Sequence, residues 1–178
     1  RAMMRLDRLW LEWSRGAAPS YTVAEIESEL LGALQYERVT GSEAFLHQGE
    51  VARIRLHVLR GELDEAWTRI GQLRDAGAGE NFSTVRASQV LRWWLAVRTG
   101  ADAAGVALSP DEAARLIAGL DLDDAASSWA LLAQVHGALG ETERQRVAQE
   151  YADRLFAEHA ERIDALKSRL TSCPELLA

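Results

Sequence analysis

The chain has 178 residues, of which 48% are hydrophobic, 26% charged and 7% aromatic. These proportions are those of an ordinary globular protein and exclude a disordered tail or a collagen-like fibre. A chain of this length buries about 70% of its unfolded surface, which is enough for one sizeable core. We therefore expect a single domain over residues 1–178. The sequence begins within an amphipathic pattern, which is compatible with a segment of a longer multidomain protein.

Acidic side chains outnumber basic ones by 27 to 20, which gives a net charge of -7. Because nucleic-acid binders need an excess of positive charge, we expect no direct contact with DNA or RNA. Cys173 is the single cysteine, so no internal disulfide can form and a reducing cytoplasmic compartment fits best. Apolar stretches are interrupted by charges, and we expect no membrane span. The arginine-rich composition, with Lys167 as the only lysine, is typical of GC-rich bacterial genomes.

Helix-forming patterns begin at the N-terminus. A first apolar stripe at helical spacing consists of Met3, Leu6, Trp10 and Trp13, and the segment Gly16 to Ser20 ends it. Thr22 followed by Glu25 is the pattern of a capping box, which predicts the start of a second helix that extends to about residue 39. Strand signals are nearly absent from the whole chain.

Six more helices are predicted in the remainder of the chain. Glycines, helix-capping residues and proline place them at about residues 43–60, 63–76, 83–99, 110–119, 122–140 and 143–170. The sixth helix has the clearest start, because Ser109 can cap it, Pro110 suits its first turn and Glu112 faces the positive end of the helix dipole. We therefore predict an all-α fold of about eight helices.

Three glycines indicate an internal repeat. Gly61, Gly100 and Gly140 each follow a helix of similar apolar pattern and are spaced 39 and 40 residues apart. A period of this size is typical of stacked helical hairpins, in which each hairpin covers the apolar stripe of its neighbour. We expect Gly61 and Gly100 to lie in tight turns with positive φ.

The segment Gly61-Glu62-Leu63-Asp64-Glu65-Ala66 resembles the turn and the first small residue of the second helix in tetratricopeptide-like repeats. Trp129, Leu132 and Ala133 before Gly140 add to the resemblance. It implies a right-handed superhelix of antiparallel helix pairs. Repeats of 39 to 40 residues are similar to those in the sensor or scaffold arms of bacterial ATP-dependent regulators, and HEAT-like or armadillo-like stacks have a similar period.

One column of positions is a candidate binding strip. The third helix carries Arg55 in the middle of its apolar face, and Trp94 and Gln134 occupy the same register in the fifth and seventh helices. If this column and Arg98 line the concave groove of a superhelix, they suit a peptide with a carboxylate and an apolar group. The alternative is that Trp94 belongs to the core and Arg55 pairs internally with Glu62 or Asp64.

The last predicted helix is the longest and has an apolar stripe longer than one neighbouring helix can cover. The stripe consists of Ala152, Leu155, Phe156, His159, Ile163, Leu166 and Leu170. This helix is expected either to cap the end of the stack or to dock on a second chain as a homodimer. Its exposed side places Glu150 before Arg154 and Glu158 before Arg162 at i,i+4 spacing, which favours a helix.

No pattern predicts a catalytic, metal or cofactor site. His47, His57, His136 and His159 include no pair at i,i+3 or i,i+4, and Cys173 lies in no basic cluster. Gly77-Ala78-Gly79 lacks the lysine of a phosphate-binding loop. We therefore expect no enzyme, no cofactor and no metal.

Two functions remain after these exclusions. The first hypothesis is a non-catalytic protein–protein interaction or sensor scaffold of a bacterial regulatory protein, with a protein or peptide partner in the concave groove. The alternative is a module that binds a small effector molecule and is coupled to an ATPase or DNA-binding domain outside this segment.

Overall fold

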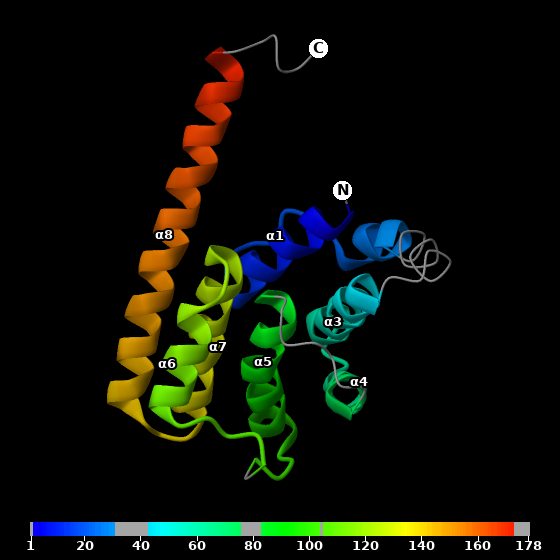
Figure 1. The fold of residues 1–178 in the computed structure, drawn as a ribbon, viewed down its shortest axis with the longest axis vertical. Helices are drawn as coiled ribbons and strands as arrows, with labels where there is room; N and C mark the ends of the chain where they lie inside the picture. The colour runs from blue at the N-terminus through cyan, green and yellow to red at the C-terminus, as the bar shows by residue number, and fades with distance from the viewer. Residues whose placement is uncertain (1, 31–42, 76–82, 104, 173–178) are drawn as a thin grey trace.

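The computed structural model describes residues 2–30, 43–75, 83–103 and 105–172. These residues form helices and no strand, so the all-α prediction is confirmed (Figure 1). Residues 23–30 are helical, and the remainder of the predicted second helix lies outside the described residues. The other helices are α1 Ala2–Ser14, α3 Glu43–Leu59, α4 Leu63–Asp75, α5 Ser83–Thr99, α6 Pro110–Ala118, α7 Leu122–Ala138 and α8 Thr142–Ser172.

Local capping signals fix several helix starts. Ser109 caps α6 through a hydrogen bond from the Glu112 backbone N–H, and the Glu112 carboxylate accepts one from the Ser109 backbone N–H in return. Thr22 and Glu25 make the same reciprocal pair before residues 23–30. The capping box at Thr22 and the cap at Ser109 were predicted, and each box satisfies two backbone donors that the first turn of a helix leaves unpaired.

The repeated glycines end three helices in the same way. Gly61, Gly100 and Gly140 have φ angles of 77°, 72° and 75°, so the predicted positive φ of the first two is confirmed. In the turn after α3, the Glu62 N–H donates to the His57 carbonyl at 2.9 Å, which is the long bond of a Schellman motif. His136 and Glu141 repeat this bond at 2.9 Å in the turn after α7.

Side chains reinforce two of these turns. His57 Nδ1 lies 2.6 Å from the Glu62 carboxylate, and His136 Nδ1 lies 2.7 Å from the Glu141 carboxylate. The hydrogen bond from His136 holds the pKa of Glu141 below its ordinary value. His57 and His136 each lie four residues before the glycine of their turn, and the polar contact across that turn is the structural explanation of this shared register.

The helices pack in consecutive pairs around α3, α5 and α7. The pairs α3/α4, α5/α6 and α7/α8 are in contact, and α5 also packs on both α3 and α7. Helix α1 lies across this row and contacts both α3 and α7 (Figure 1). The main core contains side chains from α1, α3, α4, α5, α6, α7 and α8, with Ile54, Leu95 and Leu132 among those at most 1% exposed. No described helix is both long and apolar enough to cross a membrane.

The turn glycines allow a direct stability test. A Cβ at Gly61 or Gly100 would meet no atom within 4 Å, so the cost of alanine comes from the positive φ alone. We expect Gly61→Ala and Gly100→Ala each to lower the free energy of unfolding by about 1 kcal/mol or more. Gly71 is the matched control, because it lies inside α4 with equally open space. Gly71→Ala should leave stability unchanged or raise it by up to about 1 kcal/mol. Urea unfolding measures all three variants, and equal effects would contradict the backbone explanation.

Candidate functional site

Three of the four predicted binding residues, Trp94, Arg98 and Gln134, lie next to one another. The Trp94 indole Nε1–H donates to the Gln134 side-chain oxygen at 2.9 Å, and the Arg98 guanidinium lies 5.7 Å from the Trp94 ring centre. Trp13 of α1 contacts Trp94 edge-on, with ring centres 5.5 Å apart. Arg55 lies farther along the same row and reaches this cluster through Trp10, which stacks on Trp13.

The groove interpretation requires Arg55 and Trp94 to be solvent-accessible, whereas the structure has both side chains buried, as the alternative interpretation expected of Trp94. Arg55 is 5% exposed and Trp94 is 3% exposed, whereas Arg98 and Gln134 are exposed. The physical reason is the position of α1, which packs on α3 and α7 and places Trp10 against Arg55 and Trp13 against Trp94. A partner cannot contact the two buried side chains while α1 is in this position.

Buried Arg55 is held by two carboxylates. Its Nη2 donates to Asp124 at 2.7 Å and its Nη1 donates to Asp7 at 3.1 Å, while its guanidinium lies 5.2 Å from the Trp10 ring centre. Internal pairing was the alternative expectation, but the proposed partners Glu62 and Asp64 were wrong. Glu62 instead contacts His57 and Arg60 at the turn after α3.

The carboxyl group of Asp7 has a raised pKa in this arrangement. Burial raises its pKa to about 6, against the opposing effect of the Arg55 guanidinium, and the nearby carboxylates of Asp123 and Asp124 add to the rise. The carboxylates of Asp7, Asp123 and Asp124 are thus close enough to repel one another at the junction of α1, α3 and α7, and the Arg55 guanidinium pairs with Asp7 and Asp124. The geometry of this site is that of a structural ion-pair network.

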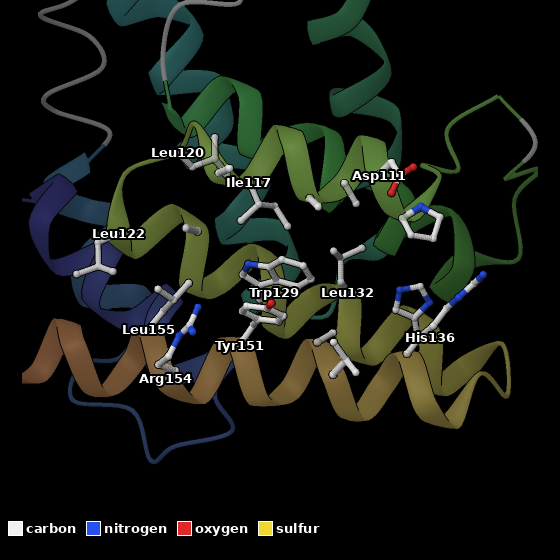
Figure 2. Close-up of a pocket in the computed structure, with 18 of the residues that line it drawn as sticks. Asp111, Ile117, Leu120, Leu122, Trp129, Leu132, His136, Tyr151, Arg154 and Leu155 are labelled. Carbon is white, nitrogen blue, oxygen red and sulfur yellow. The ribbon is translucent and has the colours of Figure 1, made fainter.

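An open groove on the opposite side of α7 is a better candidate for ligand binding. Helices α6 and α8 both pack on α7 but not on each other, and the space between them has a volume of about 900 Å³. Figure 2 shows this α6–α8 groove with Trp129, Leu132 and Ile117 at its centre. Short helix α6 cannot cover the full length of α7, so the groove remains open.

The α6–α8 groove combines an aromatic surface with charges at its edges. Trp129 and Tyr151 stack with their ring centres 4.8 Å apart, and Tyr151 is 40% exposed. The Arg154 guanidinium lies 4.9 Å from the Tyr151 ring centre. Asp111 lies toward the other end of the groove from Arg154 (Figure 2). Such a surface can bind an apolar or aromatic group and orient an attached anion toward Arg154.

The Arg154 side chain can interact with a ligand in the groove, because the ion pair that the sequence predicted for it does not form. Glu150 was expected to pair with Arg154 but contacts Arg146 instead. Glu158 pairs with Arg162 at 2.6 Å, as the spacing predicted. No described Asp or Glu residue has a carboxylate within 4.0 Å of the Arg154 guanidinium. The guanidinium lies instead over the Tyr151 ring at the edge of the groove.

The sequence analysis did not identify this groove. Trp129 was used only as a sign of the repeat, and Tyr151 is not part of the apolar stripe of α8. The available signal was the spacing of Tyr151 and Arg154 on one face of a helix. No group of three potential metal ligands occurs within the described ranges. Comparison of the chain with known protein families, curated proteins and solved structures finds no match.

Removal of Trp94 distinguishes a core residue from a groove residue. We expect Trp94→Ala to lower the free energy of unfolding by about 3 to 5 kcal/mol, since it removes a buried aromatic side chain next to Trp13. Arg98→Ala is the control, because it removes an exposed neighbour of the same ring and should change stability by about 0.5 kcal/mol or less. Chemical unfolding measures both, and a small effect of Trp94→Ala would contradict the position of α1.

The pKa of Asp7 predicts a pH dependence of known sign. Its pKa in the folded chain, about 6, lies above the ordinary value of 3.8, so the folded state binds this proton more tightly than the unfolded state. This contribution to stability is present at low pH and decreases as the pH rises through 6. Asp7→Asn removes the titration and preserves an oxygen acceptor for Arg55. We expect wild type to lose stability relative to Asp7→Asn between pH 4.5 and 7.5 in urea unfolding. A relative gain would mean that the ion pair with Arg55 outweighs burial.

Proposed function

We propose that this chain is a non-catalytic protein-interaction or sensor scaffold of a bacterial regulatory protein, and that its binding surface is the α6–α8 groove. The observation that carries the proposal is the aromatic stack of half-buried Trp129 and exposed Tyr151, with the Arg154 guanidinium over the Tyr151 ring. Aromatic residues and arginine are the side chains most often found at binding hot spots.

The shape and charge of the groove favour a peptide with an apolar face and an acidic residue. An amphipathic helix can place its apolar side chains between α6 and α8 on the surface of Trp129 and Leu132, in the manner of other helix-in-groove complexes. An acidic side chain on that helix can then pair with Arg154. This is the ligand chemistry that the sequence suggested for Arg55 and Trp94, assigned to a different part of the molecule.

The proposed scaffold is tetratricopeptide-like in its repeat of helix, glycine turn and helix. The confirmed turns at Gly61 and Gly100 support a repeat of 39 residues, and the contacts of α5 with both α3 and α7 support its stacking. We place the chain in the cytoplasm as a segment of a regulator whose catalytic or DNA-binding part is a separate domain. The net charge of -7 supports a protein partner rather than a nucleic acid.

A labelled peptide panel tests the proposal. One amphipathic helical peptide carries leucines at i, i+4 and i+7 with flanking glutamates, a second replaces the glutamates by lysines, and a third replaces the leucines by serines. Fluorescence anisotropy should show the tightest binding for the first peptide. Tyr151→Ala should weaken it by about 2 kcal/mol, or roughly thirtyfold, and Arg154→Glu should reverse the preference between the acidic and basic peptides.

Leu139→Ala is the matched control, because Leu139 is 52% exposed but does not line the groove. It should bind the acidic peptide as wild type does. Equal binding of all three peptides, or unchanged affinity in Tyr151→Ala, would contradict the proposal.

The size of the groove supports one alternative. A volume of about 900 Å³ lies within the range of about 300 to 1,000 Å³ that is typical of small-molecule sites. In that case the chain is an effector-binding module, and an aromatic carboxylic acid is the class that fits Trp129, Tyr151 and Arg154. A thermal-shift screen of aromatic acids distinguishes the two functions, since only the alternative predicts stabilisation that Tyr151→Ala abolishes.

A further inference from the structure

The two walls of the α6–α8 groove carry different charges. On the side of α6, which we call the α6 wall (residues 110–121), the charged side chains that line the groove are Asp111 and Asp121. Asp111 lies in the first turn of α6, and Asp121 follows the end of this helix. No basic side chain of residues 110–121 lines the groove, so this wall is acidic.

Neither carboxylate of the α6 wall is neutralised by an ion pair. Arg115 donates to the backbone carbonyl of Asp111 at 3.2 Å, and Asp121 bonds to Ser83 through its backbone N–H. In the part of the chain that the structure describes, no basic side-chain nitrogen lies within 4.0 Å of either carboxylate. Both residues are exposed, so both charges are accessible to a ligand in the groove.

The opposite wall, formed by residues 143–162 of α8, has an excess of positive charge. Its charged lining residues are Glu143, Arg144, Arg154 and Arg162. All except Arg154 make an ion pair elsewhere on the chain, at 2.6 to 2.9 Å. Arg154 lies over the Tyr151 ring, and a ligand carboxylate can therefore pair with it without breaking an ion pair.

The charges thus differ across the groove. Trp129 and Leu132 form its apolar centre, with Asp111 on α6 at one side and Arg154 on α8 at the other (Figure 2). A bound segment that covers the apolar centre has carboxylates on one flank and a guanidinium on the other. Complementary charges on both flanks therefore distinguish the right partner from a helix that is acidic or basic throughout.

We propose that the partner segment in the α6–α8 groove is an amphipathic helix with acidic residues on one flank of its apolar stripe and basic residues on the other. This inference rests on the proposed function, in which the groove binds an amphipathic helix, and it adds the second flank. The acidic flank faces Arg154, and the basic flank faces Asp111 and Asp121. Since α6 has 9 residues and is about 14 Å long, basic residues two turns apart on the partner reach both carboxylates.

The order of the two flanks also determines the direction of the bound helix. Turning a helix end for end, with its apolar stripe kept on the floor of the groove, exchanges its flanks. Only one direction then places the basic flank against the α6 wall. A peptide in which the two flanks are exchanged therefore binds in the opposite direction.

Fluorescence anisotropy with two helical peptides tests the charge pattern. Both peptides carry the same leucine stripe, but the first has glutamates on one flank and lysines on the other, whereas the second has glutamates on both flanks. At low ionic strength, wild type should bind the first peptide at least about fivefold more tightly, because ion pairs replace like-charge contacts at the α6 wall. The double variant Asp111→Asn with Asp121→Asn removes both charges at nearly constant size and should reduce the difference to less than about twofold.

Asp153→Asn with Glu161→Gln is the matched control, because it makes the same change in net charge at two exposed residues that do not line the groove. This control should keep the wild-type preference. Equal or tighter binding of the second peptide by wild type, or a preference that survives Asp111→Asn with Asp121→Asn, would overturn this inference and leave the groove as the binding site. Unchanged affinity of both peptides for Tyr151→Ala would instead contradict the proposed function, and this inference with it.

A paramagnetic label tests the direction. A nitroxide at the N-terminus of the first peptide should broaden the amide NMR signals at one end of the groove, either residues 111–114 or residues 120–122. A third peptide with the two flanks exchanged should broaden the signals at the other end. Broadening at the same end by both peptides would show that the two walls do not orient the helix, which would overturn the inference.

Discussion

Arg55 is a cation held out of water between two carboxylates, and the position of α1 depends on it. The guanidinium joins Asp7 of α1, its own helix α3 and Asp124 at the start of α7. An arginine that is 5% exposed would be costly without such partners, since removal of one partner from a buried ion pair costs about 3 to 5 kcal/mol. Trp10 and Trp13 pack beside this network. The ion pairs and the aromatic contacts therefore hold α1 across the row of α3, α5 and α7.

The position of α1 determines which surfaces remain for binding. Arg55 and Trp94 suit a ligand with a carboxylate and aromatic groups, and α1 supplies both through Asp7 and the two tryptophans. The α6–α8 groove remains uncovered, because short α6 leaves it open beside α8, and the proposed function concerns this groove.

Local features of this fold were predictable, and the long-range ones were not. Helix starts at Thr22 and Ser109 and turns at Gly61 and Gly100 depend on capping and on φ within a few residues. The partners of Arg55 lie 48 and 69 residues away in sequence, and helical periodicity carries no information on which of 27 acidic residues will face it. The same limit applies to the α6–α8 groove, because it exists only where two helices pack on a third but not on each other. The spacing of Tyr151 and Arg154 marked one wall of that groove, but their position opposite Trp129 required the tertiary structure.

Hydrogen–deuterium exchange on Arg55→Met and wild type tests the account most directly. Methionine fills much of the same volume but cannot pair with Asp7 or Asp124, so both carboxylates lose their buried cation. We predict that backbone amides of α1, residues 2–14, lose protection in the variant, while amides in the α7–α8 pair keep that of wild type. Unchanged protection of α1, or an equal loss in α1 and in the α7–α8 pair, would contradict the claim that Arg55 holds α1 against α3 and α7.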